Sequence, residues 1–268
     1  MKMNASKRNL AARLLPLAGA VALFACTESH FSSPDSASDI PGGQGGSMAR
    51  FTVHGDHLYT VNDSQLHMFD ISAPDRPVHL PQKTQYMEAG VETIFSMDTL
   101  LFIGSQTGMY IYNVTREGFP QQIAYAPHIT GCDPVVASGC YAYVTINSEN
   151  SWCGRGSDEL RVYDISDPYN PELVHTEGGF RHPRGLGVDG DRLFVCDDGL
   201  RVFDVSDPAR PKWIDDLTHL TGVGAIDAYD VIPLDGTLLL TGAGGLYQFD
   251  YTGGRMAFIS KIEVSSEN

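Results

Sequence analysis

The chain has 268 residues with 42% hydrophobic content, which suits one soluble globular domain or at most two. Its formal net charge of -15, from 18 Lys and Arg against 33 Asp and Glu, argues against nucleic acid, because phosphate binding draws on clustered basic side chains. The 28 Gly and 15 Pro are spread along the chain, and no segment of ordinary helix length keeps a 3.6-residue apolar period. We therefore expect a core built mostly from strands.

The first 25 residues have the form of an export signal. A head with four Lys and Arg residues precedes the apolar run 14–25, which is too short to span a bilayer permanently. The run ends in Leu23-Phe24-Ala25-Cys26, which resembles the lipobox of bacterial lipoproteins, where the Cys thiol is acylated and the preceding peptide is removed. We predict a signal peptide over residues 1–25 and a membrane anchor on Cys26. An uncleaved anchor with an incidental Cys is the alternative.

Residues 26–47 read as a flexible tether. They are rich in Ser, Asp, Pro and Gly, and they hold too little apolar surface to fold alone. Glu28 is the second residue after Cys26, and it is not the Asp associated with inner-membrane retention in bacterial lipoproteins. This favours the outer membrane, on its periplasmic or its external face.

Five copies of one unit fill residues 48–268. Each copy is a strand of alternating apolar residues that closes on Asp or Asn, and these closing residues lie 43, 51, 40 and 46 positions apart. Upstream of each copy is a pair of apolar segments around a tight turn, which is typical of a hairpin. Each unit therefore offers four short strands, as a propeller blade does. The five copies are Leu66–Ser72, Met109–Thr115, Leu160–Ser166, Leu200–Ser206 and Leu246–Thr252.

The repeated residues resemble a known family. Gly55-Asp56-His57-Leu58-Tyr59 and, in another copy, Leu160–Pro171 with its Asp-Ile-Ser-Asp-Pro-x-x-Pro ending resemble the LVIVD repeats of bacterial exported proteins. The resemblance covers about four fifths of the chain. It implies an all-β fold, a β-propeller, for which we predict five four-stranded blades over residues 48–268. It implies no activity, because most members of that family have no assigned chemistry.

The acids that close the repeated strands have a structural explanation. Asp70, Asp164, Asp204 and Asp250 each precede a Ser or Thr, and three of these copies continue into a Pro-rich turn. A carboxylate at this position can accept backbone N–H groups of the turn. A catalytic role would need other acids or bases to converge on each of them. Asn113 in copy two can make most of the same hydrogen bonds.

Chain direction sorts the variable residues onto two faces. The connections from the fourth strand to the next first strand, and from the second strand to the third, share one face, called here the top face. The strand starts at the channel mouth form two successive rings. The first ring is Ala49, Glu92, Asp133, Arg184 and Tyr229, and the second is Arg50, Thr93, Pro134, Gly185 and Asp230.

This mouth differs from blade to blade and carries charges of both signs, as a binding site does. The candidate ligand-contacting residues are Glu92, Asp133, Arg184, His182, Asp227 and Asp230. The alternative is that these charges pair with one another around water and hold the blades together. Ca²⁺ could use Glu92, Asp133 and Asp230, but Arg184 stands in the same ring and the chain has no calcium-loop spacing, so we predict no metal.

Four cysteines remain after Cys26, in an oxidising compartment that allows pairing. Cys132, Cys153 and Cys196 belong to the top face. Cys140 lies in a turn between first and second strands, a strand length away and beyond disulfide reach. We predict that Cys132 pairs with Cys153 and that Cys140 and Cys196 are free. Cys132 with Cys196 is the alternative.

A long insertion, Asn147 to Glu159, distinguishes the third unit. It contains Trp152 and Cys153, and long loops on a rigid scaffold often carry function. A disulfide at Cys153 would hold Trp152 beside the mouth, where an indole can stack on a sugar ring or a peptide side chain. The alternative is a loop that covers an apolar gap between blades.

Catalytic and cofactor patterns are missing from the sequence. There is no His-Glu-x-x-His, Gly-x-Ser-x-Gly, Cys-x-x-Cys or phosphate-cradling glycine loop, and we expect no cofactor. The leading hypothesis is a surface-tethered binding or scaffold propeller that holds a protein, peptide or glycan through its top face. One alternative is a glycosidase-like enzyme that uses carboxylates such as Glu92 and Asp133. Another is a purely structural envelope protein.

Overall fold

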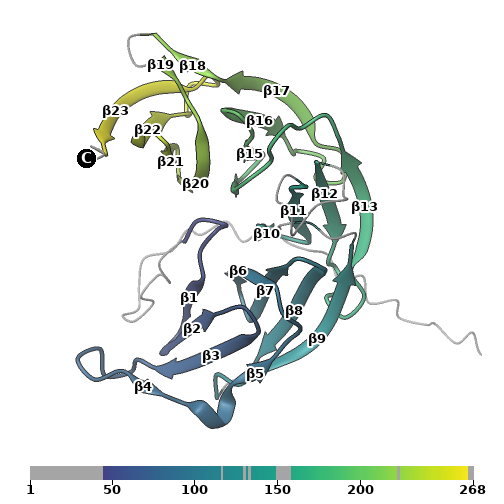
Figure 1. Cartoon of the computed structure of the whole chain (residues 1–268). Helices are drawn as coiled ribbons and strands as arrows, with labels where there is room; N and C mark the ends of the chain where they lie inside the picture. Colours follow the sequence, from purple (N-terminus) through teal and green to yellow (C-terminus); the bar gives the residue numbers. More distant parts are fainter. Residues whose placement is uncertain are drawn as a thin grey trace, which may run out of the picture.

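The computed structural model describes residues 45–115, 117–128, 131, 134–148, 158–221 and 224–264. Five antiparallel sheets stand around a common axis, each made of four consecutive strands with the first strand innermost (Figure 1). The protein is therefore a five-bladed β-propeller, as the repeats predict. The predicted signal peptide and Cys26 lie outside the described residues.

Blade 1 comprises β1 (Phe51–His54), β2 (His57–Val61), β3 (Gln65–Asp70) and β4 (Val78–His79), and β5 (Gln85–Tyr86) also pairs with β3. Blade 2 comprises β6 (Val91–Met97), β7 (Leu100–Ser105), β8 (Gly108–Val114) and β9 (Pro120–Pro127). Blade 3 comprises β10 (Val135–Ser138), β11 (Tyr141–Ile146), β12 (Glu159–Asp164) and β13 (Glu172–Glu177). Blade 4 comprises β14 (Leu186–Asp189), β15 (Arg192–Cys196), β16 (Leu200–Asp204) and β17 (Lys212–Leu217). Blade 5 comprises β20 (Ala228–Leu234), β21 (Thr237–Gly242), β22 (Gly245–Asp250) and β23 (Ala257–Glu263). The short elements η1 (Pro81–Lys83), β18 (His219–Leu220) and β19 (Gly224–Ala225) lie in connections.

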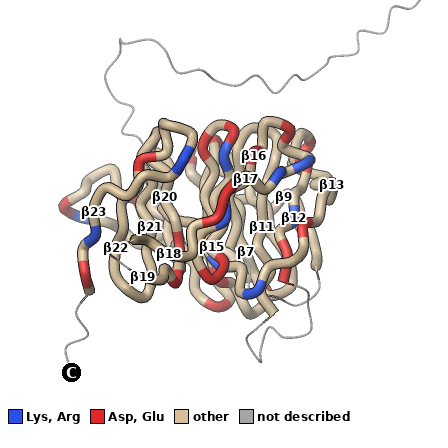
Figure 2. Tube along the Cα trace, turned by 90° about the horizontal axis from the view of Figure 1, so that it is seen from above, with Lys and Arg blue, Asp and Glu red and all other residues tan. Residues whose placement is uncertain are grey.

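The tight turn between the first and second strands uses left-handed backbone in every blade. Blades 1, 3 and 4 place a glycine there with φ between 51° and 56°, and blades 2 and 5 place an aspartate with φ of 51° and 42°. Glycine adopts this conformation without steric cost, and aspartate tolerates it better than most residues. The turn residues are Gly55, Asp98, Gly139, Gly190 and Asp235. Figure 2 shows charged residues mainly in the turns at the two faces of the ring.

The structural role predicted for the closing acids is confirmed. In blades 1, 3, 4 and 5 the carboxylate accepts the backbone N–H two residues later, at 2.9, 2.8, 2.8 and 2.7 Å. Each bond closes a turn of the Asx type, which is why the same acid recurs in blade after blade. The four acids are Asp70, Asp164, Asp204 and Asp250.

The turn at Asp204 gives a stability that depends on acid. The hydrogen bonds from Ser206 lower the pKa of Asp204 from its ordinary value of 3.8, because they favour the charged carboxylate. A lowered folded-state pKa adds stability above the ordinary value, and this stability is lost as the pH falls through the lowered value. Asp204→Asn keeps an acceptor for the Ser206 N–H but has no carboxyl group to protonate. We expect its melting temperature to depend less on pH below pH 3.8 than that of the parent chain. Thermal melts between neutral and acidic pH test this, and an unchanged slope contradicts it.

Four apolar clusters fill four junctions between neighbouring blades. They lie between blades 1 and 2, 2 and 3, 3 and 4, and 4 and 5, with fully buried aromatic residues such as Phe102, Phe194 and Phe203 in them. In the second and third strands of blades 2, 3 and 4, consecutive residues are buried on both faces of the sheet. In blades 1 and 5 the same strands alternate between buried and partly exposed residues. Among the described residues, no apolar cluster joins blade 5 to blade 1.

The outermost strand of blades 2 to 5 carries a β-bulge at one repeated place. In each of these blades one residue of the outer strand lies opposite no residue of the third strand. A bulge of this kind bends the strand and increases its twist. The extra residues are Ile123, Val174, Ile214 and Ile259.

The cysteine predictions are corrected in part. Cys140 lies in the turn after β10 as expected, but it is disulfide-bonded, so the prediction that it is free is wrong. Cys196 is the free and buried cysteine of the described residues, which rules out its pairing with Cys132. The partner of Cys140 therefore lies outside the described residues, as do Cys132 and Cys153. The strand-length argument failed because it constrains only cysteines whose positions regular strands fix.

Candidate functional site

The centre of the ring is held by the segment that leads into β1. Ser47 is fully buried; its Oγ donates to Asp230 Oδ1 at 2.9 Å and accepts the Leu186 N–H at 2.7 Å. The Met48 N–H lies 3.3 Å from the second carboxylate oxygen of Asp230. Gly46 passes so close to this carboxylate that a β-carbon there would lie 2.0 Å from it. The segment 46–48 thus joins blade 1 to the inner strands of blades 4 and 5, and we call it the clasp.

The clasp provides hydrogen-bond donors to the buried carboxyl group of Asp230. Burial raises the pKa of its carboxyl, and the hydrogen bonds from Ser47, Met48 and Val231 act in the opposite direction. Each carboxylate oxygen therefore has a donor from the protein itself. Ser47 was predicted to end the flexible tether, but its burial places the end of that segment inside the domain.

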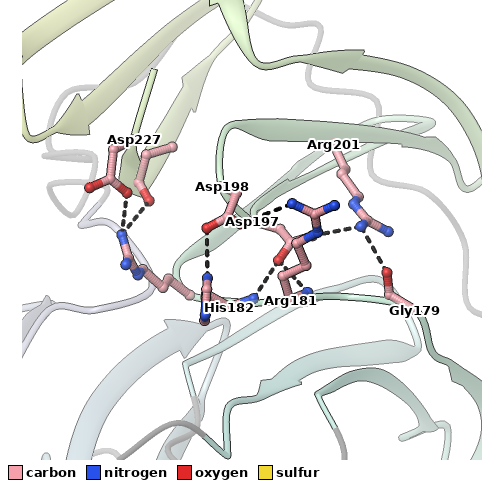
Figure 3. A network of polar contacts seen from close by, with 9 residues as sticks. Gly179, Arg181, His182, Asp197, Asp198, Arg201 and Asp227 are labelled. Carbon is pink, nitrogen blue, oxygen red and sulfur yellow. Dashed lines mark hydrogen bonds and ion pairs between the residues drawn. The ribbon is translucent and has the colours of Figure 1, made fainter. Parts of the chain in front are cut away.

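A polar network on the top face of blade 4 orders the loop before β14. Asp197 is buried and accepts the N–H groups of Arg181 and His182 at 2.8 and 2.6 Å. Its other oxygen pairs with Arg201 at 2.7 Å. Arg201 also donates to the Gly179 carbonyl at 2.8 Å (Figure 3). A buried charge with this many partners is well compensated, so the loop is held in one conformation.

His182 and Asp198 form a half-exposed pair on this loop. His182 Nδ1 lies 2.7 Å from Asp198 Oδ1, and this hydrogen bond is the main reason that the pKa of Asp198 is lowered (Figure 3). An ionised carboxylate can only accept, so Nδ1 of His182 carries the proton of this hydrogen bond. Arg181 lies 3.9 Å from the other oxygen of Asp198, and its side chain is 78% exposed.

Arg184 connects this loop to blade 5. Its Nη1 donates to Asp227 Oδ1 at 2.6 Å and to the Ala228 carbonyl at 3.3 Å. Its guanidinium lies over the ring of Tyr229, 5.0 Å from the centroid, and Tyr229 is 40% exposed. The Arg184 contacts and the His182–Asp198 pair are neighbours, because the charge of Arg184 also contributes to the lowered pKa of Asp198. We call these residues together the blade 4–5 patch: Arg181, His182, Arg184, Asp198, Asp227 and Tyr229.

Three of the predicted ligand-contacting residues meet in this patch, namely Arg184, His182 and Asp227. Asp230 instead bonds with the clasp, and Glu92 accepts from Gln106 Nε2 at 3.3 Å in blade 2. Asp133 and Trp152 lie outside the described residues. Within the described ranges, no three His, Cys, Asp or Glu side chains are grouped closely enough to hold a metal ion.

Four residues of this site were not among the candidates predicted from the sequence: Asp197, Asp198, Arg201 and Tyr229. The sequence placed Tyr229 at the channel mouth, but Tyr229 was not selected as a ligand-contacting residue. A signal was available for two of the four. Asp197-Asp198-Gly199 is the connection from the second to the third strand of blade 4, so it belongs to the top face, and Asp198 and Gly199 have positive φ. Acids in such a turn should have been considered with the mouth residues.

A cleft lies away from the patch. It has a volume of about 420 Å³, lies between the outer strands of blades 2 and 3, and is lined by Tyr125, Tyr163 and Tyr169 among others. The Tyr125 hydroxyl donates to the Thr107 carbonyl at 2.7 Å, so this ring is fixed by the protein. Of the predicted ligand-contacting residues that the structure describes, none lines this cleft.

The fold and the repeats define the class of protein: a repeat-built β-propeller with a mixed-charge patch on its top face. The model of the LVIVD repeat matches residues 45–80, 132–176 and 181–216. These matches cover blades 1, 3 and 4, so three of the five blades carry LVIVD repeats, as the resemblance of the sequence predicts.

Solved structures of other proteins share the fold. One is a functionally unknown protein from Desulfotomaculum acetoxidans, with a TM-score of 0.65 and 11% identity over 80% of this chain and 69% of that one. Another is the periplasmic gluconolactonase PpgL of Pseudomonas aeruginosa, with a TM-score of 0.58 and 17% identity over 79% and 68%. AztD of Citrobacter koseri gives a TM-score of 0.56 and 14% identity over 77% and 60%. Identities this low show the fold alone. No curated protein matches the chain.

Proposed function

We propose that this protein is a binding propeller that holds its ligand on the blade 4–5 patch without chemical turnover. One observation carries the proposal. The guanidinium of Arg184 lies over the exposed ring of Tyr229, and on the same loop the side chain of Arg181 is 78% exposed and lies 3.9 Å from Asp198. The sequence predicts a binding site around the whole channel mouth, and the proposed site is the part of that mouth at blades 4 and 5.

The chemistry of the patch favours a ligand with a carboxylate and a flat apolar face. Guanidinium groups bind carboxylates through paired hydrogen bonds, and tyrosine offers a rigid apolar surface with a polar edge. The chain as a whole carries a net charge of -15, so two arginines and a histidine within one patch stand out against it. An acidic glycan or an acidic peptide has these features.

The proposal includes location. The apolar run 14–25, the lipobox-like residues before Cys26 and the polar segment after it support export, acylation of Cys26 and anchoring to the outer membrane. None of the helices in the described ranges is long and apolar enough to cross a membrane. Loss of membrane association in Cys26→Ser, measured by fractionation of cells, tests the anchor.

Removal of the exposed guanidinium should weaken binding. We expect Arg181→Ala to lower the affinity for an acidic oligosaccharide or peptide at least about tenfold, the effect of a moderate interface contact worth about 1.4 kcal/mol. Isothermal titration against acidic ligands and their neutral counterparts measures this. The matched control is Arg210→Ala, an exposed arginine in the Pro turn on the opposite face. Equal affinity in both variants, or no binding by the parent chain, would count against the patch.

One observation favours a second function. His182 and Asp198 form a hydrogen-bonded pair that resembles a general base with its orienting carboxylate, and one protein of similar fold is named a gluconolactonase. Hydrolysis of a sugar lactone or glycoside by the purified chain, lost in His182→Ala, would replace the binding function with this one. No turnover, with binding intact, would leave the binding function in place.

A further inference from the structure

Within the described part of the chain, blades 1 and 5 each leave one sheet face without another blade against it. Figure 1 shows the two blades on either side of an interruption in the ring. On blade 1 the uncovered face is apolar around Thr60 and His67, and Phe51 on it is 58% exposed. On blade 5 the corresponding face surrounds Gln248, and Ile262 on it is 65% exposed. We call these two surfaces the free faces.

The composition of the free faces suits a buried interface. Blade 1 presents Phe51, Val53, Leu58, Thr60, His67 and Phe69. Blade 5 presents Ile232, Leu234, Thr237, Leu239, Thr241, Leu246, Gln248, Ser260 and Ile262. Neither set contains Lys, Arg, Asp or Glu; the acids Asp230 and Asp250 lie at the ends of the blade 5 face and bond with Ser47 and Thr252. Depletion of charge with enrichment of aromatic and aliphatic residues marks the core of protein interfaces.

The two free faces correspond to the two sides of an ordinary junction between neighbouring blades. At each of the four packed junctions, one blade presents the face that blade 5 leaves free, and the next blade presents the face that blade 1 leaves free. Faces of these two kinds therefore pack together at four places in the chain. The unpaired halves are complementary in kind to each other.

We propose that the free faces dock a second copy of this chain, with blade 1 of each copy packed on blade 5 of the other. A two-fold axis between the copies forms both contacts at once, so neither copy keeps an uncovered face. The dimer extends the blade-on-blade packing that the chain already uses. The inference is independent of the proposed ligand.

Closure within one chain is opposed by the rest of the ring. The four packed junctions are filled with large buried side chains such as Phe102, Phe203 and Tyr143, and close-packed interiors do not deform freely. The clasp also sets where the inner ends of blades 1 and 5 stand, through Ser47 and Asp230. To bring the free faces together, one chain would have to alter these contacts, whereas a second copy leaves them as they are.

Sedimentation of the full chain tests the dimer, with Cys26→Ser in every sample so that acylation adds no association of its own. We expect a dimer that Phe51→Asp and Ile262→Asp each convert to monomer, because a buried carboxylate would stand unpaired in the contact. The matched control is Ile214→Asp, a 51% exposed position on the outer strand of blade 4, which should stay dimeric. All three substituted positions are exposed, so folding is retained, and circular dichroism checks it. A monomeric parent chain overturns the proposal.

Crosslinking separates a second copy from closure within one chain. Two differently tagged copies are co-expressed, one with Thr60→Cys and the other with Gln248→Cys, and oxidised in cells. We expect a disulfide-linked product that carries both tags, and none when Thr176→Cys on β13 replaces Gln248→Cys. A double variant with both cysteines that forms only an internal disulfide, together with no product from the two single variants, would overturn the proposal in favour of intramolecular closure.

Discussion

Ser47→Ala should lower the melting temperature more than any other single loss of a hydroxyl in the described part of the chain. The substitution leaves the buried Leu186 N–H without its partner and removes one of the two hydrogen bonds that Asp230 Oδ1 accepts, the other being from the Val231 N–H. The unsatisfied N–H costs about 1 to 3 kcal/mol and the lost hydrogen bond to the carboxylate about 1 to 2 kcal/mol more, so we expect a loss of about 2 to 5 kcal/mol. For a chain of this size that corresponds to a fall of roughly 5 to 15 °C. Calorimetry measures it.

The matched control for the clasp is Ser72→Ala. Ser72 is exposed, and its backbone N–H, which the substitution keeps, donates to Asp70 in the blade 1 turn. A change of no more than about 0.5 kcal/mol is expected there, as for most surface substitutions. Similar losses in the two variants would show that the clasp does not hold blade 1 to blades 4 and 5.

The second large effect is a difference in the loss of stability between substitutions of two phenylalanines that occupy equivalent positions in their repeats. Phe203 in β16 is 1% exposed in the junction between blades 3 and 4, and Phe69 in β3 lies on the free face of blade 1. We expect Phe203→Ala to cost about 3 to 5 kcal/mol, the range for a buried aromatic side chain. Phe69→Ala should cost less than about half of that in the monomer, because its ring is only partly buried and packs on His79 at the free face.

Denaturant unfolding at high dilution, where any dimer has dissociated, measures both variants. The difference in midpoint gives the comparison directly when the two slopes agree. Equal losses would mean that blade 5 covers Phe69 in the isolated chain, and the free face of blade 1 would then not exist in solution.

The repeats made most of the fold predictable. Alternating strands that close on Asp and continue into a turn specify a blade through local chemistry alone, and the Asp204 turn forms as the sequence indicates. Burial of the two sheet faces could not be predicted in this way. Leu58 and Leu193 occupy matching positions after a Gly-Asp turn, yet Leu193 is buried and Leu58 is partly exposed, because burial depends on whether a further blade stands there.

The candidate site was predictable only in outline. Chain direction placed Arg184 and His182 on the correct face, because strand alternation fixes which connections share it. The buried Asp197 and the clasp depend on contacts between residues far apart in the chain, which periodicity does not report. Ser47 in particular stands next to a glycine-rich segment whose composition indicates a flexible tether, and a single set of hydrogen bonds to Asp230 and Leu186 overrides that composition.

The repeated bulge on the outer strands bears on how this protein avoids aggregation. A propeller exposes one strand edge per blade, and here those edges carry apolar residues, including Val174, Ile214 and Ile259. A flat apolar edge would recruit strands from other molecules through its unpaired N–H and C=O groups. The extra residue breaks the regular spacing of those groups, so an incoming strand cannot continue the ladder past it. The outer strands can therefore carry apolar residues without recruiting strands from other molecules into fibres.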